Sequence, residues 1–434
     1  MSEITAKAPT APTPKQTPQK NKALRMLALM GPGFVVGAWQ FGPGNLVSAI
    51  QAGSRYNYGL VWVIAVSVVL MLTFADMSIR VGVRSSGSVV QTIKETLGKP
   101  FGVAAGLGVF GITLCFSVGN AIGAGQAISL IGSSLGIDTS GRSGPFTVAV
   151  VGTIVCTAVV VAIVFFRSAY KVIEKLILVI VAVMATSFVI TAVVVKPDWG
   201  AAAAGLVPSV PASAGLLLIA LVGTNFSLNA AFYAGYASKE RGLRRDQYEE
   251  TTLADTVPGI VAPGIMTALV ICAAAAVFYG TEIKSGTEIA SLAKVISFPG
   301  GPLIFSLGFF GAAFSAMVAN ATAGGTLLSD GLGKGNKVSS TSVRIGVLIV
   351  LAVGVAVTIA TSGKNPVQMI ILAQALTVLI APLLGVLLFI LGNNARLMGD
   401  LKNTWWQNVL GVIGLVVILL MDYQLITQEI LAKL

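Results

Sequence analysis

The chain has 434 residues, of which 55% are hydrophobic and only 10% are charged. A soluble protein of this length needs a larger share of charged surface, so the composition indicates a membrane protein with many spans. The net charge of +11 would suit a nucleic-acid partner, but lysines and arginines that flank membrane spans account for it, and no nucleic-acid partner is expected.

Taken in chain order, residues 1–24 are rich in Pro, Thr and Lys and are predicted to be a disordered cytoplasmic tail. Residues 25–434 are predicted to form a single transmembrane domain. Apolar segments of roughly the 20 residues that a membrane helix requires predict about 11 transmembrane helices. They lie near 26–54, 59–80, 101–135, 145–166, 172–195, 213–237, 252–279, 302–330, 342–361, 366–392 and 405–422.

The distribution of basic residues predicts how the chain is oriented. If the amino terminus is cytoplasmic, about three quarters of the 28 lysines and arginines fall on the cytoplasmic side, as cytoplasmic loops favour. An odd number of spans then makes the carboxyl terminus external. We therefore expect a multi-pass protein of a bacterial inner membrane, with the lipid bilayer as its partner.

Two predicted spans are interrupted at corresponding places. Span 1 carries Gly-Pro-Gly-Asn at 42–45, and span 6 carries a run of polar residues at 223–229. Broken helices at matching positions of two halves are typical of a transporter with a midplane binding site. The halves would be an inverted repeat of about 26–195 and 213–392, with an extra helix at about 405–422. The competing interpretation of the first break is a simple kink.

Several stretches resemble one family of transporters. GPGFVVGAWQFGPGNLVSAIQAGSRYNYGLVWV resembles the first-span signature of the NRAMP (natural resistance-associated macrophage protein) family, which normally reads Asp-Pro-Gly-Asn. RSAYKVIEKLILVIVAV and NPVQMIILAQALTVLIAPLLGVLLFILGNNARLMGDLKN resemble the family around spans 5 and 10. The resemblance implies an all-α, LeuT-type fold with a 5+5 inverted repeat and broken helices 1 and 6. It also implies a transporter rather than an enzyme.

The departures from the family pattern concern the metal ligands. The usual members carry divalent transition metals with protons, held by an Asp of span 1 and a Met of span 6. Here the resemblance places Gly42 at the Asp position and Phe226 at the Met position. Span 3 carries Asn120 and Gln126 where acidic residues often serve proton movement. No metal ligand set and no cofactor are therefore expected.

An anionic substrate is the interpretation that these departures suggest. A helix that starts at a break exposes backbone N–H groups and a partial positive charge, which attract carboxylates. The chain resembles a bacterial, citrate-transporting branch of the family more than the metal carriers. The prediction is a proton-coupled secondary transporter of citrate, free or metal-complexed. Its expected substrate-binding residues are Gly42, Gly44, Asn45, Thr224, Asn225, Ser227, Asn229 and Gln374.

Each polar residue also has a plainer role open to it. Asn45, Asn229 and Gln374 would serve equally in hydrogen bonds between helices. Asn120 either lines the transport pathway or forms hydrogen bonds between helices. Asp76 lies one turn before Arg80 and is either its partner in an ion pair or a site of proton coupling.

Arg55, at the outer end of span 1, either attracts anions or is a solvated loop residue.

Two further functions remain open from the sequence. The first is a carrier of a divalent metal cation such as Mn²⁺ or hydrated Mg²⁺, because hard cations keep water and accept neutral oxygens. The second is a membrane sensor that transports nothing, since a fold does not fix a function. No nucleotide-binding signature is present in the sequence, so neither a nucleotide partner nor ATP-driven transport is expected.

Overall fold

The computed structural model describes residues 41–137, 139, 147–165, 170–211, 213–281, 293–296 and 299–431, and all regular structure in these residues is helical. The predicted tail and residues 25–40 of the predicted domain lie outside them. The long helices are α3 (Pro43–Tyr56), α4 (Val61–Arg84), α6 (Lys99–Ser134), α7 (Val148–Phe165), α8 (Tyr170–Val195), α10 (Gly215–Asn225), α11 (Leu228–Glu240), α13 (Val257–Phe278), α15 (Gly301–Gly331), α16 (Thr341–Ala360), α17 (Pro366–Leu376), α18 (Ala381–Asn393) and α20 (Trp405–Gln424). Shorter elements are α5 (Val89–Leu97), α9 (Trp199–Ala204), η1 (Arg245–Gln247), α12 (Tyr248–Thr251), η2 (Thr252–Thr256), η3 (Ala293–Val295), η4 (Thr377–Leu379), α19 (Ala395–Met398), η5 (Gly399–Leu401) and η6 (Leu425–Ile430).

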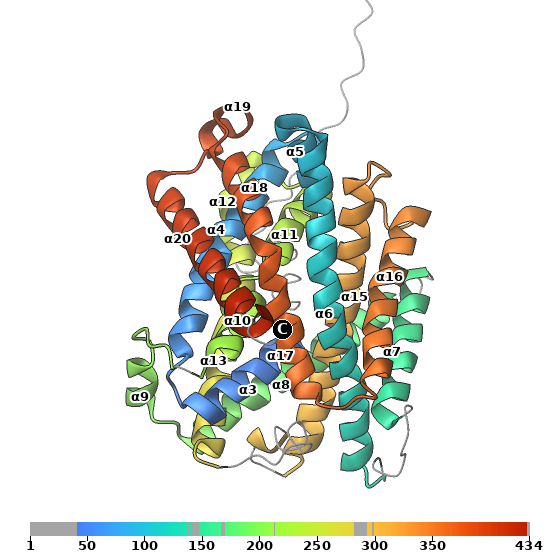
Figure 1. Cartoon of the computed structure of the whole chain (residues 1–434), viewed down its shortest axis with the longest axis vertical. Coiled ribbons are helices and arrows are strands. Elements are labelled where there is room, and N and C mark those ends of the chain that lie inside the picture. Colours follow the sequence, from blue (N-terminus) through green and yellow to red (C-terminus); the bar gives the residue numbers. More distant parts are fainter. Residues whose placement is uncertain are drawn as a thin grey trace, which may run out of the picture.

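The helices occupy the positions that hydropathy predicts. In the described part of the chain, 8 helices are long and apolar enough to cross a membrane, and the bent pair α17–α18 makes 9. α3 and α8 lie at the two remaining predicted positions, spans 1 and 5. Figure 1 shows the long helices side by side, with most of them along the long axis of the molecule.

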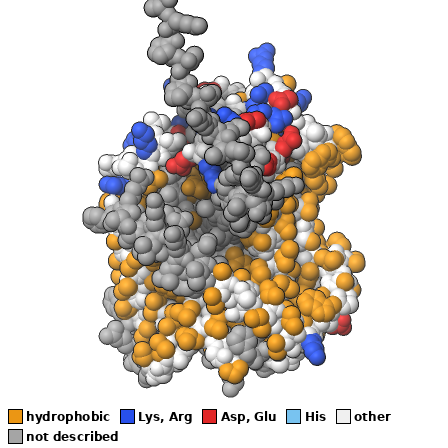
Figure 2. Space-filling model, turned by 180° about the vertical axis from the view of Figure 1, so that it is seen from behind, with side chains coloured by type: hydrophobic (Ala, Val, Ile, Leu, Met, Phe, Trp, Pro, Cys, Tyr) orange, Lys and Arg blue, Asp and Glu red, His pale blue; other side chains and the backbone are white. Residues whose placement is uncertain are grey.

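The surface divides into an apolar body and a charged end. Figure 2 shows hydrophobic side chains over most of one face, while charged side chains gather mainly at the end where Figure 1 places α5 and α19. Along α20, the exposed side chains include Val409, Val412, Val416 and Leu420. An apolar surface of this extent is stable only against lipid, so the bilayer is the solvent of this body.

Glycines let the helices approach closely. A Cβ on Gly82 of α4 would lie 2.4 Å from the carbonyl oxygen of Gly235 of α11, and a Cβ on Gly106 of α6 would lie 2.6 Å from that of Leu327 of α15. Neither contact leaves room for a side chain. Close backbone contact through small residues is the usual way in which membrane helices associate.

The break in span 6 is present in the structure. α10 ends at Asn225 and α11 begins at Leu228, with Phe226 (φ −107°, ψ 64°) and Ser227 (φ −87°, ψ 96°) outside helical geometry. At the described start of span 1, Gly42 is extended (φ −87°, ψ 179°) and Pro43 opens the helix. Proline suits that first position because it has no N–H to leave unpaired.

Three features were not predicted from the sequence. α5 and α9 are short helices in the connections after spans 2 and 5. Span 10 bends by 42° between α17 and α18. The bend has a local cause, since Pro382 lies two residues after Ile380, where the helix is broken, and cannot donate the backbone hydrogen bond that would continue the helix.

Candidate functional site

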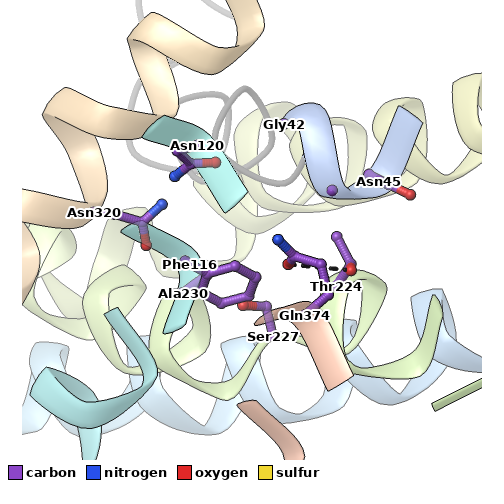
Figure 3. A pocket seen from close by; sticks show the side chains of 10 residues that line it. Gly42, Asn45, Phe116, Asn120, Thr224, Ser227, Ala230, Asn320 and Gln374 are labelled. Atoms are coloured by element: carbon purple, nitrogen blue, oxygen red, sulfur yellow. Dashed lines mark hydrogen bonds between the residues drawn. The ribbon is translucent and has the colours of Figure 1, made fainter. Parts of the chain in front are cut away.

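A cavity lies where α3 begins and span 6 is broken. About 300 Å³ of space lies between its lining atoms, and part of that space is open to the surroundings. Figure 3 shows side chains from helices far apart in the sequence converging on it. The lining residues are Gly42, Gly44, Asn45, Phe116, Asn120, Thr224, Ser227, Ala230, Asn320 and Gln374. Six of the eight expected substrate-binding residues are therefore in or around one cavity.

Asn45 and Asn225 tie span 1 to span 6. Each side-chain amide donates to the oxygen of the other, at 3.2 Å in both directions, and Asn225 also donates to the carbonyl of Leu221 at 2.9 Å. Asn225 is not among the lining residues. From the sequence, Asn45 could either bind substrate or form hydrogen bonds between helices. In the structure it lines the cavity and is hydrogen-bonded to Asn225 of α10.

Gln374 is the residue that span 10 contributes to the described wall of the cavity. The Thr224 hydroxyl lies 3.4 Å from the side-chain oxygen of Gln374, and it also donates to the carbonyl of Ala220 at 2.7 Å (Figure 3). Glycines surround Gln374 closely: a Cβ on Gly44, Gly119 or Gly223 would lie within 2.8 Å of one of its atoms. The glutamine therefore reaches the cavity only because these positions carry no side chain.

A second hollow lies on the other side of the span 6 break. It encloses about 240 Å³ and is lined in part by Gly223, Phe226, Asn229 and Thr377. Asn229, expected in the substrate site, borders this hollow and not the first. The hydroxyl of Ser227 donates to the side-chain oxygen of Asn229 at 2.5 Å, and Ser227 borders both hollows.

None of the described residues that line the first cavity carries a charge or a titratable group. Among the residues that the structure describes, no group of three His, Cys, Asp or Glu side chains is placed to hold a metal ion. The chemistry on offer is therefore that of amides, hydroxyls and the backbone around the breaks. These groups supply oxygens with partial negative charge and N–H or O–H donors, but no full charge.

Asp76 lies in a separate polar cluster near the charged end. Its carboxylate forms an ion pair with Arg80 at 2.9 Å, accepts a hydrogen bond from Gln407 at 3.2 Å, and accepts another from the hydroxyl of Tyr248. Arg80 in turn donates to the carbonyl of Leu401 at 2.6 Å. The ion pair expected between Asp76 and Arg80 is therefore present, and Asp76 does not line the cavity.

The other two pathway candidates differ in position. Arg55 is exposed in the last turn of α3 and does not line the cavity. Asn120 does line it, and its side-chain nitrogen is buried without a hydrogen-bond partner. Gln126 lies about two turns further along α6. Its side chain donates to the carbonyl of Gly363 at 3.4 Å and so links α6 to the connection between α16 and α17.

Three lining residues were missed by sequence reasoning: Phe116, Ala230 and Asn320. Phe116 and Ala230 are apolar residues in apolar segments, so nothing marks them. Asn320 had a signal, because it is a lone amide within the 31-residue apolar helix α15. Polar side chains inside membrane spans usually face the interior of the bundle and have a function.

The fold and the cavity define a multi-pass membrane protein with a hollow at a helix break. The chain belongs to the NRAMP family, because the family model described as natural resistance-associated macrophage protein-like matches residues 33–428. The family consists of membrane transporters, so the prediction that the chain is not an enzyme is confirmed.

The chain is similar in sequence to bacterial proteins named divalent metal cation transporter MntH. It is 21% identical to that of Levilactobacillus brevis over 426 residues, covering 93% of this chain and 90% of the relative. It is 24% identical to that of Bacillus subtilis over 416 residues, covering 93% and 92%. The predicted membership of the family is therefore confirmed.

Solved structures confirm the fold. The chain matches the manganese transporter of Eremococcus coleocola, in complex with an aromatic bis-isothiourea substituted compound, with a TM-score of 0.75, 18% identity, and coverage of 96% of this chain and 91% of that one. It also matches MhsT in complex with L-phenylalanine, with a TM-score of 0.59, 16% identity, and coverage of 90% and 98%. The all-α, LeuT-type fold is as predicted.

The prediction of citrate, and of a carboxylate as the binding partner, is wrong. Relatives that cover more than nine tenths of this chain are named as transporters of divalent metal cations. The error has a physical reason, since removing acidic ligands does not create an anion site. Among the described residues that line the cavity there is no lysine or arginine. A multivalent carboxylate would be buried there without a counter-charge.

Proposed function

We propose that this protein is a secondary transporter of a divalent metal cation, and that the cation enters the cavity with part of its hydration shell. The observation that carries the proposal is the uncharged, oxygen-rich wall of the cavity. The names of the relatives support the substrate class.

The ligand chemistry favours a hard cation. Asn45, Thr224, Ser227 and Gln374 offer amide and hydroxyl oxygens, which suit Mg²⁺ or Mn²⁺ better than softer metals. Mg²⁺ gives up its water reluctantly and is usually bound with several waters in place. An uncharged wall suits such an ion, because each coordinated water spreads the positive charge outward and presents hydrogens to acceptors.

A fully dehydrated transition metal fits less well. Such an ion in a low-dielectric site needs an anionic or soft ligand to replace its water. Gly42 and Phe226 supply neither, and no other residue that lines the first cavity is acidic or contains sulfur. We therefore expect Mg²⁺ to be carried in preference to metals that demand thioether or carboxylate ligands.

Within this proposal the binding residues are Gly42, Gly44, Asn45, Thr224, Ser227 and Gln374. Asn225 acts by positioning Asn45, with which it exchanges hydrogen bonds. The predicted domain organisation is kept as part of the proposal: a tail at 1–24, one transmembrane domain at 25–434, repeats at about 26–195 and 213–392, and an extra helix at about 405–422. The break in span 6 and the helix α20 support it.

The proposed orientation places α5 and α19 in the cytoplasm, with the amino terminus inside and the carboxyl terminus outside. The basic residues on or next to the elements at this end include Lys94, Lys99, Arg244, Arg245, Lys334, Lys337, Arg396 and Lys402. Fewer basic residues belong to the end that carries α9, as expected for an external face. The bacterial relatives support placement in a bacterial membrane.

The test is cation uptake by purified protein in liposomes. A magnesium-sensitive dye inside should report Mg²⁺ entry that depends on the protein and saturates with external Mg²⁺. Mn²⁺ should compete, and its own uptake should be measured with a manganese-quenched dye. If neither ion enters under an inside-negative potential, the transporter proposal is overturned and the sensor alternative gains support.

A further inference from the structure

Two asparagines form one side of the cavity, opposite the residues that the broken helices contribute. Figure 3 shows Asn120 of α6 and Asn320 of α15 beside each other, facing Asn45, Thr224 and Gln374 across the space. Both are only 2% exposed. Neither helix is broken at these residues, so this wall is rigid secondary structure and not an unwound segment.

Each asparagine has one polar atom without a partner. The side-chain oxygen of Asn320 and the side-chain nitrogen of Asn120 are buried and make no hydrogen bond. The nitrogen of Asn320 donates to the carbonyl of Ala316 at 3.0 Å, so its amide orientation is fixed and its oxygen is the atom left over. A buried polar group without a partner destabilises a protein, so a ligand that supplies the missing partner is favoured.

Close packing holds this wall in place. A Cβ on Gly324 of α15 would lie 2.2 Å from the hydroxyl oxygen of Thr113 of α6, so the two helices touch one turn beyond Asn320. Further along α6, a Cβ on Gly123 would lie 2.6 Å from the side chain of Pro43, at the start of α3. The position of the two amides is thus set by close contacts between glycines and side chains of neighbouring helices, which leave little freedom.

We propose that Asn120 and Asn320 bind the hydration water of the transported cation, with Asn320 as the residue that selects a hydrated ion. This inference rests on the proposed function and deepens it. A water bound to a cation points its hydrogens outward and needs acceptors, which the free oxygen of Asn320 provides. The free N–H of Asn120 donates to a water of the next shell.

The arrangement distinguishes hydrated from dehydrated ions. An ion stripped of water and held by Asn45, Thr224 and Gln374 would sit against one wall and leave the free oxygen of Asn320 unpaired. The waters that a hydrated ion keeps extend its reach, so such an ion can meet Asn120 and Asn320 through a water while the opposite wall holds it. Mg²⁺, which loses water slowly, then gains from Asn320 more than Mn²⁺ does.

The experiment compares Asn320→Leu and Asn120→Leu with the wild type in liposomes. Leucine has nearly the same shape as asparagine but no polar atom. The expected result for Asn320→Leu is a KM for Mg²⁺ that rises by about tenfold or more, with a smaller rise for Mn²⁺. Asn336→Leu, in an exposed loop, is the control for handling and insertion.

A second probe tests hydration directly. Hexaamminecobalt(III) holds six ligands that it does not exchange, and it presents N–H donors outward much as hexahydrated Mg²⁺ presents its O–H groups. It should inhibit Mg²⁺ uptake by the wild type, and the concentration needed for half-inhibition should be at least about tenfold higher for Asn320→Leu.

Thermal unfolding separates this role from a structural one. Replacing a partnerless buried group by an apolar one of similar shape should leave the melting temperature unchanged or raised. A structural role would instead lower the melting temperature and leave the ratio of Mg²⁺ to Mn²⁺ uptake unchanged. Asn320→Ser, which keeps a short hydroxyl, serves if the leucine variant does not fold, and its Mg²⁺ KM should lie between those of wild type and Asn320→Leu.

The outcomes are distinguishable. If the wild type carries Mg²⁺ and both leucine variants keep its KM and its inhibition by hexaamminecobalt(III), the asparagine proposal is overturned and the proposed function stands. If the wild type carries no divalent cation, the proposed function fails and the asparagine proposal fails with it. Selective loss of Mg²⁺ affinity in a stable variant supports both.

Discussion

A Cβ on Gly44 would lie 2.2 Å from the side-chain carbon Cδ of Gln374. The absence of one methyl group in span 1 therefore decides whether the amide of span 10 reaches the cavity. Real Cβ contacts are never that short, and Gln374 cannot retreat freely because Gly119 and Gly223 also hold it closely. The position of Gln374 in the wall of the cavity depends on that fit.

We predict that Gly44→Ala reduces Mg²⁺ uptake at least about tenfold, because the new methyl group displaces Gln374 or widens the contact between spans 1 and 10. Overpacking of this kind usually destabilises a protein by about 1–3 kcal/mol, which a melting curve would detect. Adding Gln374→Ala should restore the melting temperature but not the uptake. Wild-type uptake by Gly44→Ala would contradict the role given to this contact.

We predict that Gly42→Asp shifts the preference from Mg²⁺ to Mn²⁺. Gly42 is the N-cap residue of α3 with no side-chain cap, and aspartate is favoured at that position, so the variant should fold. At 4 Å and an effective dielectric constant of 20, opposite unit charges attract by about 4 kcal/mol, which is ample for a tenfold lower Mn²⁺ KM. Dye-based uptake of both ions measures the shift, with Asn336→Asp as the charge control. An unchanged ratio would show that residue 42 does not face the ion.

We predict that the membrane potential, and not a pH gradient, drives uptake. No residue that lines the first cavity is titratable, so these residues give a coupled proton no place to bind. A divalent ion that crosses a potential of 100 mV gains about 4.6 kcal/mol. Liposomes with a potassium and valinomycin gradient should fill rapidly, while a pH gradient of either sign should change the initial rate by less than about twofold. A strong response to pH alone would instead support the proton coupling predicted from the sequence.

We predict that Asp76→Asn lowers stability without changing the KM for Mg²⁺. The partner Arg80 has a side chain that is only 3% exposed, and removing one member of a buried pair typically destabilises a protein by about 3–5 kcal/mol. The remaining bonds of Arg80 to Leu401 and Asn403 should reduce the loss. Asp246→Asn is the matched control, because its ion pair with Arg244 is about two-thirds exposed. A raised KM with normal stability would point to a part in transport.

We predict that the contribution of Asp400 to stability depends on pH. Its hydrogen bond from Arg245, at 2.9 Å, is the main cause that lowers the pKa of this carboxyl group. A lowered pKa in the folded state means that the carboxylate stabilises the fold above the unfolded pKa, and that this effect is lost as pH falls through the folded pKa. Asp400→Asn should therefore melt slightly below wild type at pH 7, and the difference in melting temperature should shrink as the pH falls below the unfolded pKa of the carboxyl group. A difference that grows as the pH falls would contradict this account.

The spans and the span 6 break were predictable because both leave direct marks in the sequence. A membrane helix needs a long apolar run, and the polar run around Thr224 and Ser227 interrupts one. The bend of span 10 had a mark as well, Pro382, which the prediction overlooked. Asn320 was harder to place, because which side of α15 faces the cavity depends on how that helix packs against α6.

The sign of the substrate charge could not be derived from the cavity residues. An amide carries both an acceptor oxygen and donor hydrogens, so Asn45 and Gln374 suit either an anion or a hydrated cation. The prediction of citrate took the loss of acidic residues as evidence for a negative ligand. A counter-charge was required for that conclusion, and the lining residues of the cavity contain none.

The hydroxyl of Ser227 borders the hollows on both sides of the span 6 break, and only Phe226 and Ser227 interrupt the helix there. The same residue is thus part of the wall of both hollows, and two residues outside helical geometry are all the chain that separates α10 from α11 at this place.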